Sequence, residues 1–568
     1  MKSDLEIAAG VPCRPISQIA ASLGLSESDY APYGHNKAKL ELSVFDRFAG
    51  KPDGHLVLVT AITPTPAGEG KTTTTIGLAD ALRRRGKRVV AAIREPSLGP
   101  VFGRKGGAAG GGWAQVIPME DINLHFTGDF HAVCAANNLL VAMTDNHIFH
   151  GNALQIDPER VVLKRCLDMN DRALRHIELK TIGKGGYVRQ AGFEITAASE
   201  LMAVLCLASD IADLKRRISN VIVAYNIHGE PVTAGDLHAA EAAAVLLKEA
   251  IKPNLVQTLE GTPVLIHGGP FANIAHGCNS LLATRLALKL ADYTVTEAGF
   301  GSDLGAEKFI DIKCRFGGLK PAVAVLVVTI RALKMHGGLA KNELENEDLA
   351  ALERGLPNLL RHLDNLVNVF KLPAVVAVNR FPADTQAELD LVMKACASMG
   401  VRTVLSDVWA KGGEGGLELA DAVTELCEKN SNPEFEFAYP LEGMSLREKL
   451  NTIVRRVYRG RDAVFTEEAE RQLELLAKHG GDSMPVCVAK TPYSFTGDQT
   501  LIGAPEGFDL LIRDLKISGG AEFVVALAGD IMTMPGLPSS PAAERIHIAD
   551  DGTVDGLFWP PAFRLPAA

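Results

Sequence analysis

Residues 56–86, LVLVTAITPTPAGEGKTTTTIGLADALRRRG, decide how the first part of the chain folds. The apolar run at residues 56–61 predicts a buried strand. Ile76, Ala79 and Leu82 fall on one face of a predicted helix that ends at Gly86. A short loop with two glycines joins the strand to the helix. The three elements follow one another in the order of a P-loop, the loop that holds nucleotide phosphates.

The loop residues have the chemistry that phosphate binding needs. Gly68 and Gly70 let backbone N–H groups turn toward an anion, and the positive end of the helix dipole points to the same place. Lys71 can reach the terminal phosphates, and the Thr72 hydroxyl can ligate Mg²⁺. The predicted nucleotide-binding residues are Thr65, Pro66, Ala67, Gly68, Glu69, Gly70, Lys71 and Thr72, with Thr72 also the predicted metal ligand.

The loop departs from the general pattern GxxxxGK[ST] at its first position, where Thr65 replaces glycine. The alternative interpretation is a glycine-rich turn before an ordinary helix. Four consecutive threonines at residues 72–75 start a helix poorly by propensity, which favours a functional use of their hydroxyls. Cations near the helix end suit the dipole there, so we interpret them as a solvated surface: Arg83, Arg84, Arg85, Lys87 and Arg88.

Short apolar runs separated by helical patterns predict an α/β protein. Most runs lack alternation, as strands covered on both faces do, which predicts a mostly parallel sheet. We expect a large P-loop nucleotide-binding core at residues 1–365 with an inserted substrate-loop segment, and smaller α/β domains at 366–480 and 481–568. The predicted strands lie at residues 56–61, 88–93, 139–143, 220–225, 263–267, 322–329, 373–379 and 402–406.

Composition limits the classes of function. The 568 residues are 47% hydrophobic and 22% charged, which is typical of a globular protein. A net charge of −10 argues against nucleic-acid or membrane-surface binding, and the apolar stretch at residues 322–330 is too short to cross a bilayer, which takes about 20 residues. The nine cysteines contain no CxxC pair, so we expect reduced thiols and a cytoplasmic protein. Residues 1–15 carry Asp4 and Glu6 and lack an apolar core, so we expect no secretory signal.

Other loops that follow predicted strands carry polar groups. Arg94 follows the run at residues 88–93 and should face the phosphates, because ligands gather at the carboxyl ends of parallel strands. Residues 104–113, RKGGAAGGGW, are expected to close over the site, with a flexible linker as the alternative. Residues 297–305, EAGFGSDLG, are expected to line the site. Clustered His and Asp at residues 125–150 fit no zinc spacing.

Several strings together resemble the formate-tetrahydrofolate ligase family, also called formyltetrahydrofolate synthetase. The resemblance covers nearly the whole chain in the same order, and that family also begins its phosphate loop with threonine. The strings lie at residues 65–75, 94–104, 127–131, 297–308, 329–338, 379–382, 409–415, 492–497 and 529–538.

The resemblance implies an ATP-dependent joining of formate to N10 of tetrahydrofolate through formyl phosphate. It implies that Arg94 holds formyl phosphate and that Phe381 and Trp409 sandwich the pterin ring in a folate-binding domain at residues 366–480. Lys71 would stabilise the transferring phosphoryl group. Asp129 matches an active-site acid that either orients the folate or accepts the N10 proton.

The resemblance also implies a homotetramer, activation by K⁺ or NH₄⁺, and a cytoplasmic role in one-carbon metabolism. Two alternatives remain at this point. One is an ATP-dependent ligase for another carboxylic acid, which would have no need of the pair Phe381 and Trp409. The other is a nucleotide-switched ATPase that acts on a partner protein.

Overall fold

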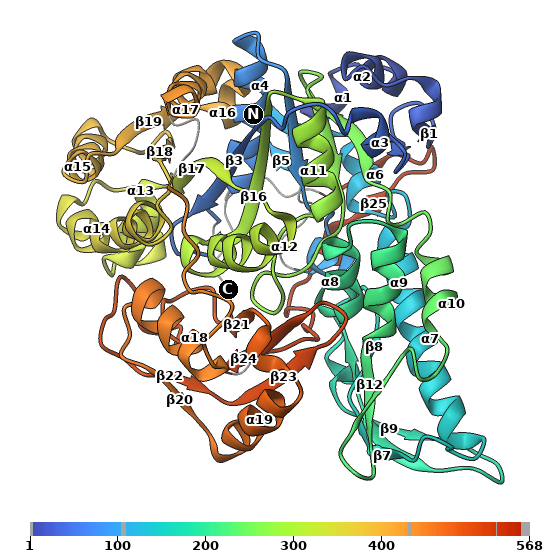
Figure 1. Ribbon diagram of the computed structural model, residues 1–568. Coiled ribbons are helices and arrows are strands. Elements are labelled where there is room, and N and C mark those ends of the chain that lie inside the picture. The colour runs from blue at the N-terminus through green and yellow to red at the C-terminus, as the bar shows by residue number, and fades with distance from the viewer. Residues whose placement is uncertain (1–3, 67, 104–108, 430–433, 530, 558–568) are drawn as a thin grey trace.

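The computed structural model describes residues 4–66, 68–103, 109–429, 434–529 and 531–557. Within these ranges a 12-stranded sheet forms the centre of the molecule (Figure 1). Along its main path the order is β1 (Tyr30–Pro32), β2 (Ala38–Leu40), β14 (Asn254–Thr258), β15 (Pro263–Ile266), β4 (Val89–Ile93), β16 (Tyr293–Gly301), β3 (His55–Ala61), β17 (Pro321–Val328), β18 (Ala374–Asn379) and β19 (Arg402–Ser406); β5 (Gly110–Gly111) and β6 (Ala114–Ile117) join beside β14.

The run from β15 to β19 is parallel throughout, whereas β1, β2, β14 and β6 pair in antiparallel fashion. The carboxyl ends of β4, β16, β3, β17, β18 and β19 therefore meet at one edge of the sheet. In parallel sheets ligands gather at this edge. The predicted mostly parallel α/β architecture is confirmed.

Helices cover both faces of the sheet, and side chains alternate between the faces. Val57, Val59 and Ala61 pack with the helices α4 (Lys71–Arg84) and α17 (Leu417–Lys429). Leu56 and Leu58 point to the other face, where α14 (Leu349–Asp364) and two π-helical turns at residues 302–306 and 309–314 pack. Other helices around the sheet are α1 (Asp4–Ala9), α2 (Ile16–Ser22), α3 (Val44–Phe48), α5 (Leu98–Phe102), α6 (Met119–Asn123), α11 (Leu281–Leu290), α12 (Arg315–Gly317), α13 (Ile330–His336), α15 (Gln386–Ala397) and α16 (Val408–Lys411).

A second apolar core lies outside the sheet, at the lower right of Figure 1. Its helices are α7 (Asp129–Phe149), α8 (Glu200–Leu207), α9 (Ile211–Ser219) and α10 (Ala240–Leu246). The strands β7 (Ile156–Val161), β12 (Ile222–Asn226) and β13 (Pro231–Thr233) form a small sheet against them. Two further pairs are β8 (Arg165–Cys166) with β11 (Phe193–Glu194), and β9 (Ile177–Lys180) with β10 (Val188–Ala191).

The C-terminal part, at the lower left of Figure 1, forms two small sheets packed against the helices α18 (Leu446–Ile453) and α19 (Glu467–Lys478). One sheet pairs β20 (Ala463–Phe465) with β22 (Leu510–Ile512), and the other has the order β21 (Val486–Lys490), β24 (Phe523–Ala528), β23 (Asp514–Ser518). A hairpin of β25 (His547–Ile548) and β26 (Val554–Asp555) follows. Since β18 and β19 belong to the central sheet, segment 366–480 shares that sheet with segment 1–365; the boundaries at 365 and 480 stay predictions.

Seven of the eight predicted strands are confirmed, and the prediction at residues 139–143 is wrong. That run lies inside helix α7, whose buried positions Val133, Ala136, Leu140 and Thr144 follow helical spacing. The five apolar residues alone fit both structures, and only the longer window distinguishes them. Helix α10 begins at Ala240, and the carboxylate of Asp236, four residues earlier, accepts hydrogen bonds from the N–H and the hydroxyl of Thr233.

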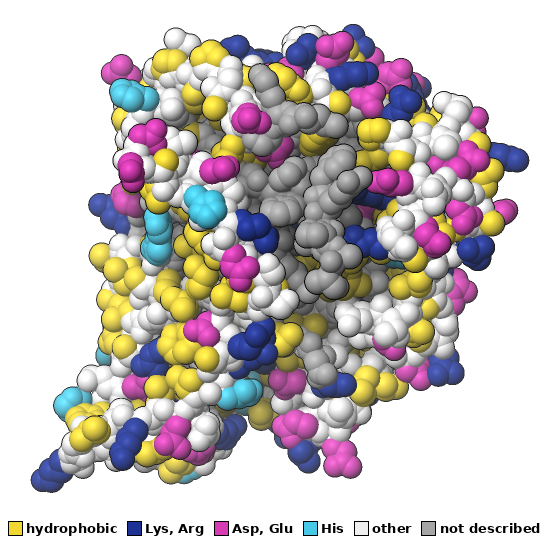
Figure 2. Space-filling view, turned by 180° about the vertical axis from the view of Figure 1, so that it is seen from behind, with side chains coloured by type: hydrophobic (Ala, Val, Ile, Leu, Met, Phe, Trp, Pro, Cys, Tyr) yellow, Lys and Arg dark blue, Asp and Glu magenta, His cyan; other side chains and the backbone are white. Residues whose placement is uncertain are grey.

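The surface carries mixed charge. Arg84, Arg85 and Lys87 near the end of α4 pair with Glu260, Asp421 and Glu428, as expected of a solvated face. Figure 2 shows basic and acidic side chains interspersed over one face of the molecule. Among the described residues, no helix is both long and apolar enough to span a bilayer. All nine cysteines are free thiols, and seven are buried.

Candidate functional site

The glycine loop, residues 62–70, leads from strand β3 to helix α4. Gly68 and Gly70 have φ angles of 75° and 76°, in the left-handed region that favours glycine. A Cβ atom on Gly70 would lie 2.6 Å from Nδ2 of Asn379, so only glycine fits there. Lys71 is the first residue of α4. This local geometry suits an anion at the helix N-terminus.

Thr65, Glu69 and Thr329 form a hydrogen-bonded clamp that joins the glycine loop to the end of β17. The backbone N–H and the hydroxyl of Thr65 both donate to Oε1 of Glu69 at 2.9 Å. Thr329, at the end of β17, donates to Oε2 of the same carboxylate at 2.7 Å, and Glu69 is buried. The clamp gives Thr65 a use that glycine could not serve, which explains the departure from the general pattern. Of the predicted loop residues, Ala67 lies outside the described residues.

Three of the four threonine hydroxyls at the start of α4 donate hydrogen bonds, each to a different residue. Thr72 donates to Oε2 of Glu297 at 2.8 Å, Thr74 donates to Oδ1 of Asn379 at 3.0 Å, and Thr75 donates to the Lys71 carbonyl at 2.9 Å. Glu297 lies within β16, the strand beside β3, and not in a loop after it. A hydroxyl and a carboxylate side by side are the oxygen ligands that Mg²⁺ prefers, so these residues fit that ion.

Arg94 comes directly after β4. Its Nη1 donates to the Pro270 carbonyl at 3.1 Å, and its buried Nε has no partner among the described residues. A Cβ atom on Gly299 would lie 3.1 Å from Nη1, so β16 leaves room for the guanidinium. Strand β16 therefore contacts both the glycine-loop helix, through Glu297, and Arg94, through Gly299.

Asp129 is the first residue of helix α7 and is buried. Lys39 donates to its Oδ1 at 2.7 Å, and Asn254 donates to its Oδ2 at 2.7 Å. Both carboxylate oxygens already have partners, and Lys39 is itself buried. The two hydrogen bonds fix the orientation of the carboxylate at the start of α7.

Phe381 and Trp409 follow the adjacent parallel strands β18 and β19, and both are half-buried. The guanidinium carbon of Arg331 lies 3.8 Å from the centroid of the Phe381 ring. Trp409 packs beside the β5–β6 hairpin, where its carbonyl accepts a 2.8 Å hydrogen bond from the Trp113 N–H. Arg331 thus packs against Phe381, and the β5–β6 hairpin packs against Trp409, at the sheet edge where the glycine loop lies.

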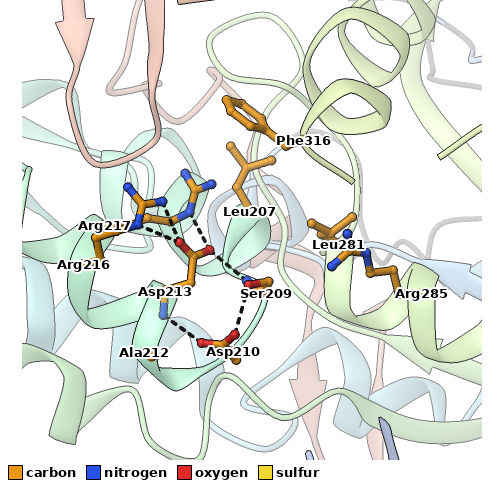
Figure 3. A pocket seen from close by; sticks show the side chains of 10 residues that line it. All are labelled: Leu207, Ser209, Asp210, Ala212, Asp213, Arg216, Arg217, Leu281, Arg285 and Phe316. Atoms are coloured by element: carbon orange, nitrogen blue, oxygen red, sulfur yellow. Dashed lines mark hydrogen bonds and ion pairs between the residues drawn. The ribbon is translucent and has the colours of Figure 1, made fainter. Parts of the chain in front are cut away.

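A cavity of about 420 Å³ lies elsewhere, between α8, α9, α11 and α12 (Figure 3). Its arginines Arg216 and Arg217 pair with Asp213 and Glu522. No residue of the glycine loop lines it, so we place the candidate site at the sheet edge instead.

Comparison with known proteins identifies one family. The profile of the family described as Formate--tetrahydrofolate ligase matches residues 2–558. A formate--tetrahydrofolate ligase of Symbiobacterium thermophilum is 59% identical over 560 residues, covering 98% of this chain and 100% of that protein. The chain belongs to the formate–tetrahydrofolate ligase family.

Within this family member, one acidic residue beside Arg94 received no role from the sequence. Glu95 is buried, and its Oε2 has no partner among the described residues. Burial, strengthened by the Asp129 carboxylate, raises the pKa of Glu95 well above its ordinary value. Its position directly after Arg94 at a strand end was the available signal.

Asn379 and Arg331 also received no individual role. Asn379 donates from Nδ2 to the Glu69 carbonyl at 2.7 Å, and Arg331 donates to the Gly68 carbonyl at 3.3 Å. Asn379 ends β18 and Arg331 follows β17, two strands that lie beyond β3 in the sheet, and both residues donate to the backbone of the glycine loop. Asn379 was visible as a polar residue ending an apolar strand.

Proposed function

We propose that this chain is an ATP-dependent formate–tetrahydrofolate ligase that works through formyl phosphate and yields 10-formyltetrahydrofolate, ADP and phosphate. The observation that carries the proposal is the shared sheet edge of the glycine loop, Arg94 and the aromatic residues Phe381 and Trp409, in a member of this family. The reaction needs three different groups at one place. Backbone N–H groups are needed for the ATP phosphates, a cation for formyl phosphate, and flat apolar faces for the pterin ring.

The glycine loop would hold the ATP phosphates through its backbone N–H groups and Lys71. Residues 65–72 form this site. Thr72, with Glu297 beside it, would hold Mg²⁺, which supplies charge neutralisation on the phosphates.

In the first transfer, a formate oxygen attacks the γ-phosphorus of ATP, the bond from that phosphorus to the bridging oxygen breaks, and ADP leaves. Lys71 stabilises charge on the transferring group. Arg94 would hold the resulting formyl phosphate, since a guanidinium fork can donate two hydrogen bonds to an anion and its Nε has no partner among the described residues.

In the second transfer, N10 of tetrahydrofolate attacks the formyl carbon, the carbon–oxygen bond to phosphate breaks, and the N10 proton passes to the departing phosphate. Phe381 and Trp409 would stack on the pterin, as flat heteroaromatic ligands require. Asp129, fixed by Lys39 and Asn254, would orient the folate or stabilise charge.

Family membership further supports three parts of the proposal: a homotetramer, activation by a monovalent cation such as K⁺ or NH₄⁺, and a cytoplasmic location. Segment 366–480, which carries Phe381 and Trp409, would be the folate-binding part.

The test mixes the protein with formate, MgATP and tetrahydrofolate, then acidifies the mixture and records the absorbance of the methenyl product. We expect absorbance only when all three substrates are present. ATP hydrolysis indifferent to formate and folate would indicate a switch ATPase, and activity with a different carboxylic acid in place of formate would indicate another ligase.

A further inference from the structure

Arg331 contacts both the glycine loop and the Phe381 ring. It lies in the first turn of α13, two residues after Thr329, whose hydroxyl holds the Glu69 carboxylate. Its Nη2 donates to the Gly68 carbonyl in the glycine loop at 3.3 Å. The same guanidinium lies over the Phe381 ring, with 3.8 Å from its carbon to the ring centroid.

The guanidinium has few other restraints. Its buried Nε has no partner among the described residues. The Glu69 carboxylate accepts from Thr65 and Thr329 on its two oxygens. The carboxylates of Glu69 and Asp384 attract the guanidinium, and its direct contacts among the described residues are the aromatic face and the loop carbonyl. An arginine over an aromatic face is a favourable arrangement.

The arrangement also orients Phe381. One face of its ring is covered by Arg331, so a flat ligand can use only the opposite face. The Phe381 N–H donates to Oδ2 of Asp384 at 2.7 Å, which fixes the backbone at this residue. Two residues earlier, Asn379 holds the Glu69 carbonyl. Arg331 thus fixes one face of the Phe381 ring, and the hydrogen bonds of Phe381 and Asn379 fix the backbone that carries the ring.

We infer that Arg331 is a positioning residue that holds the Phe381 ring in place for tetrahydrofolate and ties it to the glycine loop. The inference rests on the proposed function. Arg331 acts through Phe381, so its removal weakens folate binding by a larger factor than it lowers kcat.

A double-mutant cycle tests the inference. Calorimetric titration with tetrahydrofolate is done on the unaltered protein, Arg331→Ala, Phe381→Ala and the double variant, together with Arg331→Lys. We expect Arg331→Ala to raise the folate Kd about three- to thirtyfold, a larger factor than its effect on kcat at saturating folate, and Arg331→Lys to restore most of the loss. In the Phe381→Ala background, Arg331→Ala should change Kd by less than about twofold.

The matched control is Arg354→Ala. Arg354 is exposed on the neighbouring helix α14 and donates to the Gly337 carbonyl at 2.9 Å, away from the glycine loop, so its folate Kd should not change. If Arg331→Ala unfolds the protein, Arg331→Gln takes its place in the cycle.

An unchanged folate Kd in the Arg331 variant would overturn the inference, and so would an equal loss in the presence and absence of the Phe381 ring. In both cases the unaltered protein still binds folate and makes product. Failure of the unaltered protein to bind tetrahydrofolate would instead overturn the proposed function, and the inference with it.

Discussion

Thr72 and Glu297 are joined by a 2.8 Å hydrogen bond from the threonine hydroxyl to the carboxylate. The bond links the start of helix α4 to the middle of strand β16, and the same strand leaves room for Arg94 at Gly299. A hydroxyl and a carboxylate thus meet at the mouth of the glycine loop, where a nucleotide-bound cation would lie.

This pair predicts the Mg²⁺ dependence of the reaction. Thr72→Val removes the oxygen ligand, so the Mg²⁺ concentration needed for half-maximal activity should rise by about tenfold or more, the loss typical when one ligand or its support is removed. Thr72→Ser keeps the hydroxyl and should behave like the unaltered protein. Equal Mg²⁺ requirements in the valine and serine variants would remove Thr72 from the metal site.

Lys71 is predicted to act on the transferring phosphoryl group. Lys71→Ala should lower kcat by about 100- to 1,000-fold, the usual loss when one charge-stabilising group is removed. The melting temperature should stay nearly constant because Lys71 is partly exposed. Lys429→Ala, which breaks an exposed ion pair with Glu425, is the control. Near-normal turnover in Lys71→Ala would contradict the assignment of the glycine loop to ATP.

Arg94 should matter for the acyl phosphate more than for ATP. Arg94→Lys keeps the charge and loses the planar fork, so we expect a steep fall in kcat with little change in the KM for ATP. Steady-state kinetics with each substrate varied in turn make the measurement. A raised ATP KM with normal kcat would place Arg94 in the nucleotide site.

Asp80 predicts a pH dependence of stability. Its carboxyl is fully buried in α4 and accepts hydrogen bonds from Thr258 and Thr262 at 2.6 and 2.5 Å. Burial raises the pKa of Asp80 from 3.8 to about 7. The folded state holds the Asp80 proton more tightly than the unfolded state does. The stabilisation that protonated Asp80 adds to the free energy of unfolding is therefore fully present below pH 3.8 and is lost as the pH rises to about 7.

The variant Asp80→Asn cannot titrate at this position. Its free energy of unfolding relative to the unaltered protein should therefore increase between pH 4 and pH 7, by up to about 4 kcal/mol, and then level off. Urea unfolding at a series of pH values measures the difference. A difference that is constant with pH would show that Asp80 ionises normally.

Short-range patterns allowed the fold around the site to be predicted. Strand β3, the glycine loop and α4 are contiguous, so their apolar spacing and their glycines were sufficient. The apolar run at residues 139–143 was misassigned as a strand because five residues cannot distinguish a strand from one turn of α7. The antiparallel strands β1, β2 and β14 were missed because they are short and pair over long sequence distances.

The side-chain partners within the site could not be predicted. The clamp of Thr65, Glu69 and Thr329 joins residues 260 positions apart, and the contact of Arg331 with Phe381 depends on which strands are neighbours. Asp303, in the segment expected to line the site, forms a buried ion pair with Lys490 at 2.8 Å. Spacing along the chain carries no information about such contacts, which follow from the order of strands in the sheet.

The formyl phosphate intermediate is tested most directly with formate labelled by ¹⁸O at both oxygens. If a formate oxygen attacks the γ-phosphorus and later leaves with it, the phosphate released in the presence of ATP and tetrahydrofolate must contain one ¹⁸O from formate, as mass spectrometry would show. Unlabelled phosphate formed together with 10-formyltetrahydrofolate would contradict the account, because formate would then have been activated without forming a bond to phosphorus.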